Sequence, residues 1–198
     1  MSRQKLSERQ LPMNERQCLT EYDFALVLSH IDDATTTGAD ALFAAGCDDA
    51  TVSVRSGRVY VTFSRKAASM KDAILSAIQD VRKANIGAEV LRIDDCNLVT
   101  QAEIARKIGR SRQLVNQYYM GIRGPGGFPP PVCHIDDDSP LWYWCEVACW
   151  LWDNNMIPEA ALREAETIEV INNVLEMQHQ KRLKPELAEE IMRSIGAV

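Results

Sequence analysis

The chain has 198 residues, of which 46% are hydrophobic and 25% charged, and its formal net charge is −6. This length allows one large core or two small domains, and the composition is that of a globular protein. No apolar run approaches the ~20 residues that span a bilayer, and the opening MSRQKLSERQLPMNERQ lacks the apolar centre of a secretory signal. We therefore expect a cytoplasmic protein without membrane contact, in which the six cysteines stay reduced.

After a flexible arm, residues 1–20, the pattern of residues 21–97 predicts one α+β domain. Apolar runs, alternating residues and amphipathic spacing indicate, in order, a strand at 22–30, a helix at 36–46, a hairpin at 50–64, a helix at 69–87 and a strand at 88–94. This β-α-β-β-α-β order is that of ferredoxin-like folds, in which two helices pack on one face of a four-stranded antiparallel sheet. No residue in this domain identifies a ligand, so a protein partner and a small effector both stay open.

Residues 100–121 follow the spacing of a helix-turn-helix. With Gln101 as the first position, the fifth is alanine and the ninth glycine, as helix-turn-helix motifs require. The alanine leaves room for the crossing helix, and the glycine can adopt the left-handed turn conformation. Thr100 and Glu103 predict a capping box at the first helix, and Ser111 predicts a cap for the second, at 111–120. Arg110 departs from the template, because the tenth position is usually apolar.

The same phasing leaves a polar face on the second helix. Arg, Asn and Gln are the side chains that make bidentate contacts with guanine or adenine in the major groove. Residues 104–135 hold five basic residues and no acidic one, so local charge favours phosphate although the chain is acidic. The predicted DNA-binding residues are Arg106, Lys107, Arg110, Ser111, Arg112, Gln113, Asn116, Gln117 and Arg123. The alternative is a solvated helical hairpin with coincidental polarity.

After the helix pair come a Phe128–Pro129 pair, a tryptophan at 142 or 144, and a helix with Glu146-Val147 near its start and Trp150-Leu151 near its end. With these motifs, residues 98–153 resemble the excisionase and AlpA-type members of the MerR-like winged helix-turn-helix superfamily. The resemblance implies DNA binding, with the recognition helix in the major groove and a short two-stranded wing near the backbone or minor groove. Asp136, Asp137 and Asp138 depart from a basic wing and would repel phosphate.

The predicted domains are therefore the arm 1–20, the ferredoxin-like domain 21–97, the winged helix-turn-helix domain 98–157 and C-terminal helices at 158–198. Pro158 and Pro185 are placed to begin the two tail helices. The four tryptophans are interpreted mainly as the core of the DNA-binding domain. An exposed interaction surface is the other interpretation.

No catalytic site, cofactor or metal centre is expected. The three histidines are isolated, and no phosphate-binding loop, nucleophile elbow or zinc-protease motif occurs. Zinc at Cys133, His134, Cys145 and Cys149 is disfavoured because only the last two residues share a helical face, and buried reduced thiols fit better.

The sequence thus predicts a non-enzymatic, sequence-specific DNA-binding protein, a prokaryotic or phage-derived transcriptional regulator. An antitoxin-like or other interaction adaptor with an autoregulatory helix-turn-helix is the alternative. Because one such motif reads only a few base pairs, we expect a homodimer. The candidate dimer surfaces are the apolar stripe Leu162–Leu175 and the edges of the N-terminal sheet.

Overall fold

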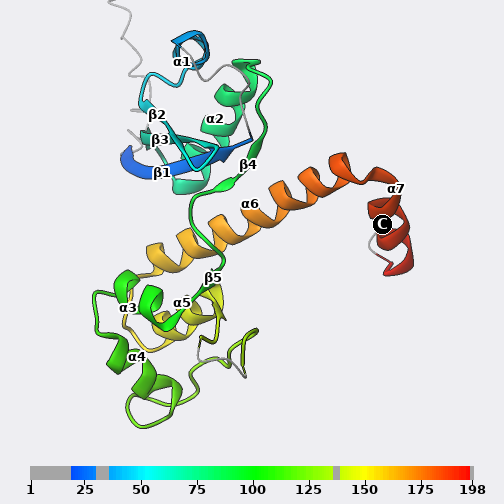
Figure 1. Ribbon diagram of the computed structural model, residues 1–198. Helices are drawn as coiled ribbons and strands as arrows, with labels where there is room; N and C mark the ends of the chain where they lie inside the picture. The colour runs from blue at the N-terminus through cyan, green and yellow to red at the C-terminus, as the bar shows by residue number, and fades with distance from the viewer. Residues whose placement is uncertain (1–18, 30–35, 136–138, 197–198) are drawn as a thin grey trace, which may run out of the picture.

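The computed structural model describes residues 19–29, 36–135 and 139–196 of the chain. Within these ranges it has seven helices, a four-stranded antiparallel sheet and a two-stranded sheet, which confirms the α+β class (Figure 1). Residues 1–18 of the predicted arm and the three wing aspartates lie outside the described residues. No helix in the described part of the chain is long and apolar enough to cross a membrane.

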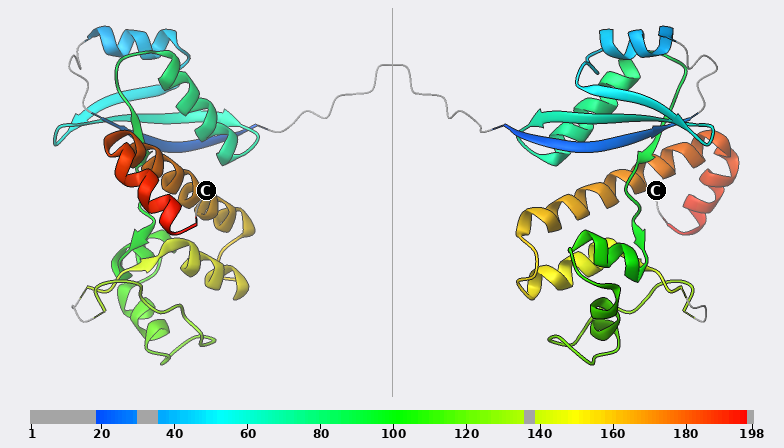
Figure 2. Two further views of the ribbon diagram at one scale, coloured as in Figure 1. Left: turned by 90° about the vertical axis from the view of Figure 1, so that its right-hand side faces the viewer. Right: turned by 60° about the vertical axis from the view of Figure 1, so that its left-hand side comes forward.

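The N-terminal unit consists of one sheet and two helices. Its elements are β1 (Thr20–Leu28), α1 (Thr36–Ala44), β2 (Ala50–Arg55), β3 (Arg58–Ala67), α2 (Met70–Lys83) and β4 (Val90–Ile93). The strands lie in the order β2-β3-β1-β4, and all neighbours are antiparallel. The helices α1 and α2 lie on the same side of the sheet (Figure 2).

Local sequence explains most of these elements. Ser56 and Gly57 form the two-residue turn between β2 and β3, and both have positive φ, as a hairpin turn of this length requires. Ser69 caps α2 by accepting a hydrogen bond from the Asp72 backbone N–H at 3.2 Å. Alternate residues of β3, among them Val61 and Phe63, are buried against the apolar face of α2.

A second, smaller core follows β4. It is built from β5 (Leu98–Val99), α3 (Gln101–Lys107), α4 (Arg112–Tyr119), β6 (Trp142–Tyr143) and α5 (Trp144–Asp153). The strand β6 pairs with β5, which precedes α3, so the two-stranded sheet joins the beginning and the end of this unit. Its buried side chains come from all five elements and include Val99, Ile104, Val115, Trp142 and Leu151.

The long helix α6 (Glu159–Leu183) runs between the two cores and packs on both, as Figure 2 shows. Leu162 and Ala165 pack against α5, and Leu175 joins the core of the N-terminal unit. The stripe Leu162–Leu175 is therefore an internal packing face, so the prediction that it forms a dimer surface is wrong. The last helix, α7 (Pro185–Ser194), packs mainly on α6 and has no buried residue.

Asn172 fastens α6 to the N-terminal unit through a buried amide. Its Oδ1 accepts a hydrogen bond from the Ile93 N–H at 2.8 Å, and its Nδ2 donates to the Asp95 carbonyl at 2.8 Å. The inner edge of β4 is used by β1, where the Asp94 N–H donates to the Ala25 carbonyl. The amide thus covers the outer edge of β4, and the segment that leads to α3 is held by the same side chain.

Candidate nucleic-acid interface

The helix α3 is positioned by a capping box at its start. The Glu103 N–H donates to Thr100 Oγ1 at 3.2 Å, and the Thr100 N–H donates to Glu103 Oε2 at 2.8 Å. The hydrogen bond from the Thr100 backbone holds the pKa of Glu103 below its usual value, because it favours the ionised carboxylate. The capping box that the sequence predicts is therefore confirmed, and it defines where α3 begins.

The turn between α3 and α4 also matches its sequence pattern. Gly109 has a φ of +62°, in the left-handed region that the turn requires. Ala105 is buried, and its carbonyl accepts a hydrogen bond from the Arg110 N–H at 2.8 Å. Ser111 caps α4 by accepting from the Leu114 N–H at 3.2 Å, so Ser111 is the N-cap and the helix itself is Arg112–Tyr119. Arg110 occupies a usually apolar template position without removing a side chain from the core, because it is exposed in the turn.

The exposed face of α4 carries three of the predicted base-reading residues. Arg112, Gln113 and Asn116 are exposed, whereas Val115 on the opposite side is fully buried. Asn116 Oδ1 accepts a hydrogen bond at 3.1 Å from Nε2 of Gln101, which is itself buried at the start of α3. This bond fixes the direction of the Asn116 carboxamide.

Gln101 is a positioning residue that the sequence did not reveal. In the sequence Gln101 is only the first template position, and its hydrogen-bond partner Asn116 lies fifteen residues further along the chain. A buried polar side chain must find a partner, but sequence spacing does not say which one. The signal would have been an amide at the beginning of α3 combined with an amide on the exposed face of α4.

The remaining predicted residues differ in their surroundings. Arg110 and Arg123 are exposed, and Arg106 is exposed at 3.9 Å from Glu103. Gln117 is half-buried. Lys107 Nζ bonds both carboxylate oxygens of Asp95 at 2.8 Å and lies 5.1 Å from the centre of the Trp144 ring. Lys107 is therefore directed toward the segment before α3 rather than toward the exposed face of α4.

A group of aromatic side chains packs against the buried side of α4. Trp142 is fully buried and Trp150 nearly so, whereas Trp144 is half-buried and Trp152 is exposed. Tyr118 lies against Trp150, with ring centres 5.4 Å apart. The core interpretation is thus confirmed for Trp142 and Trp150, and Trp152 lies outside that core.

The loop after α4 is fastened to these tryptophans. Trp142 Nε1 donates to the Pro129 carbonyl at 3.0 Å, and Trp150 Nε1 donates to the Gly126 carbonyl at 2.8 Å. The Phe128 ring packs on Trp150, with centres 5.0 Å apart. Only glycine fits at position 124, because φ is +91° and a Cβ would lie 2.8 Å from the Tyr118 ring. Arg123, one residue earlier, therefore lies next to a segment that the hydrogen bonds to Trp142 and Trp150 hold in place.

The expected two-stranded wing differs from what is observed. Within residues 131–135 and 139–143, Cys133 and Leu141 form one isolated β-bridge, and the only strand is β6, which pairs with β5. Prolines 129–131 explain the difference, because they lack the N–H groups that a longer ladder needs.

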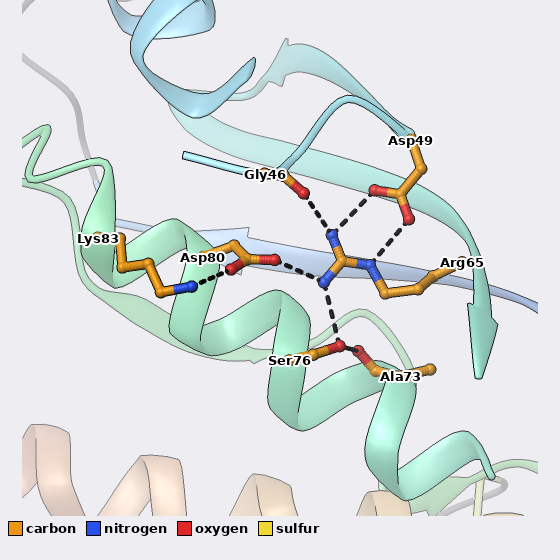
Figure 3. A network of polar contacts seen from close by, with 7 residues as sticks. All are labelled: Gly46, Asp49, Arg65, Ala73, Ser76, Asp80 and Lys83. Atoms are coloured by element: carbon orange, nitrogen blue, oxygen red, sulfur yellow. Dashed lines mark hydrogen bonds and ion pairs between the residues drawn. The ribbon is translucent and has the colours of Figure 1, made fainter. Parts of the chain in front are cut away.

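A buried charge cluster in the N-terminal unit surrounds Arg65, whose guanidinium donors are all used within the protein (Figure 3). Arg65 is 7% exposed, and its guanidinium bonds both oxygens of Asp49 at 2.8 and 2.9 Å. Its other donors bond Asp80 at 2.9 Å, Ser76 at 3.1 Å and the Gly46 carbonyl at 2.9 Å. All five N–H groups are occupied, so Arg65 ties β3 to α2 and to the segment before β2 and offers nothing to a ligand.

Two partly or fully buried thiols, Cys47 and Cys145, are held in the protonated form. Burial raises the pKa of Cys47 to about 11, and burial together with Glu169 raises the pKa of Cys145 to about 12. The cysteines at 47, 96, 133, 145 and 149 are free. Among the described residues, no group of three or more His, Cys, Asp or Glu side chains is arranged to hold a metal ion.

No protein-family model, curated protein or solved structure matches this chain.

Proposed function

We propose that this chain is a sequence-specific double-stranded DNA-binding protein, a prokaryotic or phage-derived transcriptional regulator that reads the major groove with α4. The observation that carries the proposal is the exposed face of α4, where Arg112, Gln113 and Asn116 stand together. These three residue types match the donor and acceptor pattern of guanine and adenine edges. The absence of any acidic residue from residues 104–135 lets this face approach phosphate despite the overall charge of −6.

The proposal includes two finer assignments of fold. The sheet order β2-β3-β1-β4, with α1 and α2 on one side, supports a ferredoxin-like domain for residues 21–97. The capped helix pair α3–α4, backed by Phe128, Trp142 and Trp150, supports a helix-turn-helix of the excisionase type for residues 98–157. Contact between a wing and DNA is not part of the proposal.

The mechanism is non-catalytic occupancy of an operator. The N-terminal end of α4 enters the groove, so that Arg112, Gln113 and Asn116 reach base edges. Gln101 restricts the Asn116 carboxamide before DNA binds, which lowers the entropy that binding would otherwise lose. Arg106 and Arg123 contact phosphates on either side, and such contacts position the protein without reading sequence.

The test begins with selection of a preferred site from random duplexes, followed by titrations at several salt concentrations. Arg112→Ala should weaken binding to the selected site by about 1–3 kcal/mol and relax discrimination at one base pair. Arg123→Ala should weaken selected and scrambled duplexes equally and reduce the salt slope by about one. Lys107→Ala is the matched control, because that lysine is held by Asp95, and it should leave the salt slope unchanged.

Equal, sequence-independent losses for Arg112→Ala and Arg123→Ala would leave only nonspecific electrostatic binding. If the wild-type protein binds no duplex at low salt, the proposal is wrong. In that case the interaction adaptor becomes the better interpretation, and co-purification of a stoichiometric protein partner would support it.

A further inference from the structure

The C-terminal helices carry an apolar surface that none of the described residues covers. On α6, Val170, Val174 and Met177 follow one another at helical spacing on the side opposite the buried residues Asn172 and Leu175. All three are about half exposed or more. The helix therefore has two apolar stripes, and within the part of the chain that the structure describes only one of them is packed.

Met177, at the end of the exposed stripe, lies next to apolar residues of α7. Leu187 and Ile191 are each 49% exposed, and Ile195, directly after the helix, is 72% exposed. Together with Met177 of α6 and Lys184, which lies between the two helices, they line a groove of about 270 Å³. We call the surface formed by Val170, Val174, Met177, Leu187, Ile191 and Ile195 the outer apolar face.

The size and setting of this face indicate that it is covered in the functional protein. Six aliphatic side chains that are about half exposed or more present several hundred Å² of apolar surface, which approaches the ~800 Å² per partner of a stable interface. Monomers rarely expose contiguous apolar patches of more than ~600 Å². A ten-residue helix without a buried residue is also marginal in water, since helices shorter than ~12 residues need packing.

The charges beside this face favour a second copy of the chain. Lys181 and Lys184 are exposed at the end of α6, and their side chains have no ion-pair partner among the described residues. The helix α7 carries Glu186, Glu189 and Glu190 against one basic residue, Arg193. A two-fold axis that sets α7 of one copy against α6 of the other brings opposite charges together twice, because an isologous interface repeats each contact.

We propose that the outer apolar face is a homodimer interface, in which the α6–α7 hairpins of two copies pack as a four-helix arrangement. The inference rests on the proposed function only for its purpose, because a dimer can read two operator half-sites. It also replaces the stripe Leu162–Leu175, one of the two candidate dimer surfaces, since that stripe packs within each copy.

The test is sedimentation velocity of the full chain at 1–200 µM without DNA, with circular dichroism as the check on folding. The wild-type protein should have the mass of a dimer, and Ile191→Glu should raise the dimer dissociation constant at least ~100-fold, because it places a charge in an apolar interface. Val54→Glu is the matched control at the exposed edge strand β2, where Val54 is 56% exposed, and it should remain dimeric. A monomeric wild type overturns the proposal, and so does dissociation by Val54→Glu instead of Ile191→Glu.

A charge-reversal mixture provides the second measurement, independent of whether Ile191→Glu folds. Lys181→Glu and Glu190→Lys should each weaken self-association, and an equimolar mixture should regain it, because the mixed dimer restores opposite charges at both contacts. A mixture that stays monomeric overturns the two-fold pairing. DNA binding is measured separately: a monomer that binds DNA overturns only this inference, whereas a dimer that binds no DNA overturns only the proposed function.

Discussion

Replacing Asn172 by alanine removes the amide that joins α6 to β4 and to the segment before α3. The side chain is 8% exposed, and it bonds the Ile93 N–H and the Asp95 carbonyl, each at 2.8 Å. The truncation leaves the buried Ile93 N–H without a partner, which costs about 1–3 kcal/mol, and it removes the bond to the part-buried Asp95 carbonyl, which is worth about 1 kcal/mol. We therefore expect Asn172→Ala to lower the free energy of unfolding by about 3 kcal/mol.

The measurement is urea unfolding monitored by circular dichroism and by tryptophan fluorescence, because the tryptophans report on the second core. Asn173→Ala is the matched control. Asn173 is exposed and makes a single 3.0 Å bond to Asn97, so its removal should change the free energy of unfolding by less than about 0.5 kcal/mol. If the two variants differ by less than that amount, the amide does not fasten α6 to the sheet and the reasoning is refuted.

Trp150→Ala should lower the free energy of unfolding by about 3–5 kcal/mol and weaken DNA binding as a consequence, because it removes the aromatic that supports Tyr118 and the Gly126 carbonyl. Unchanged stability by urea unfolding would contradict this core role. The capping box predicts a pH dependence: the pKa of Glu103 is lowered in the folded state, so its stabilisation is present above its ordinary value of 4.5 and is lost as pH falls through the lowered value. The stability difference between wild type and Glu103→Gln should therefore shrink under acid conditions, and a difference that is the same at pH 7 and pH 3 would count against it.

The sequence was most informative where one local rule decides the outcome. Thr100 and Glu103 are three residues apart, so their capping box could be predicted without any knowledge of the rest of the fold. The same holds for the left-handed turn at Gly109 and for the hairpin turn at Ser56–Gly57. The order of elements in the N-terminal half follows from periodicities of 2 and 3.6 residues, which are also local properties.

The sequence was less informative where a side chain has two possible partners that are distant from it in the chain. The composition of the stripe Leu162–Leu175 was as compatible with a dimer surface as with a core, and only the docking of α6 between the two units decided in favour of the core. Lys107 belongs to a basic segment, yet Asp95 and Trp144 bind it in the folded chain.

Polar contacts between distant residues were likewise decided by the tertiary structure. Asn172 lies seventy-nine residues from Ile93, and Gln101 lies fifteen from Asn116, so no helical or strand period connects either pair. The sequence by itself determined which faces of each element are apolar and where helices begin. The tertiary structure decided which of those faces meet, because burial of a polar group is favourable only when packing brings its partner within hydrogen-bonding distance.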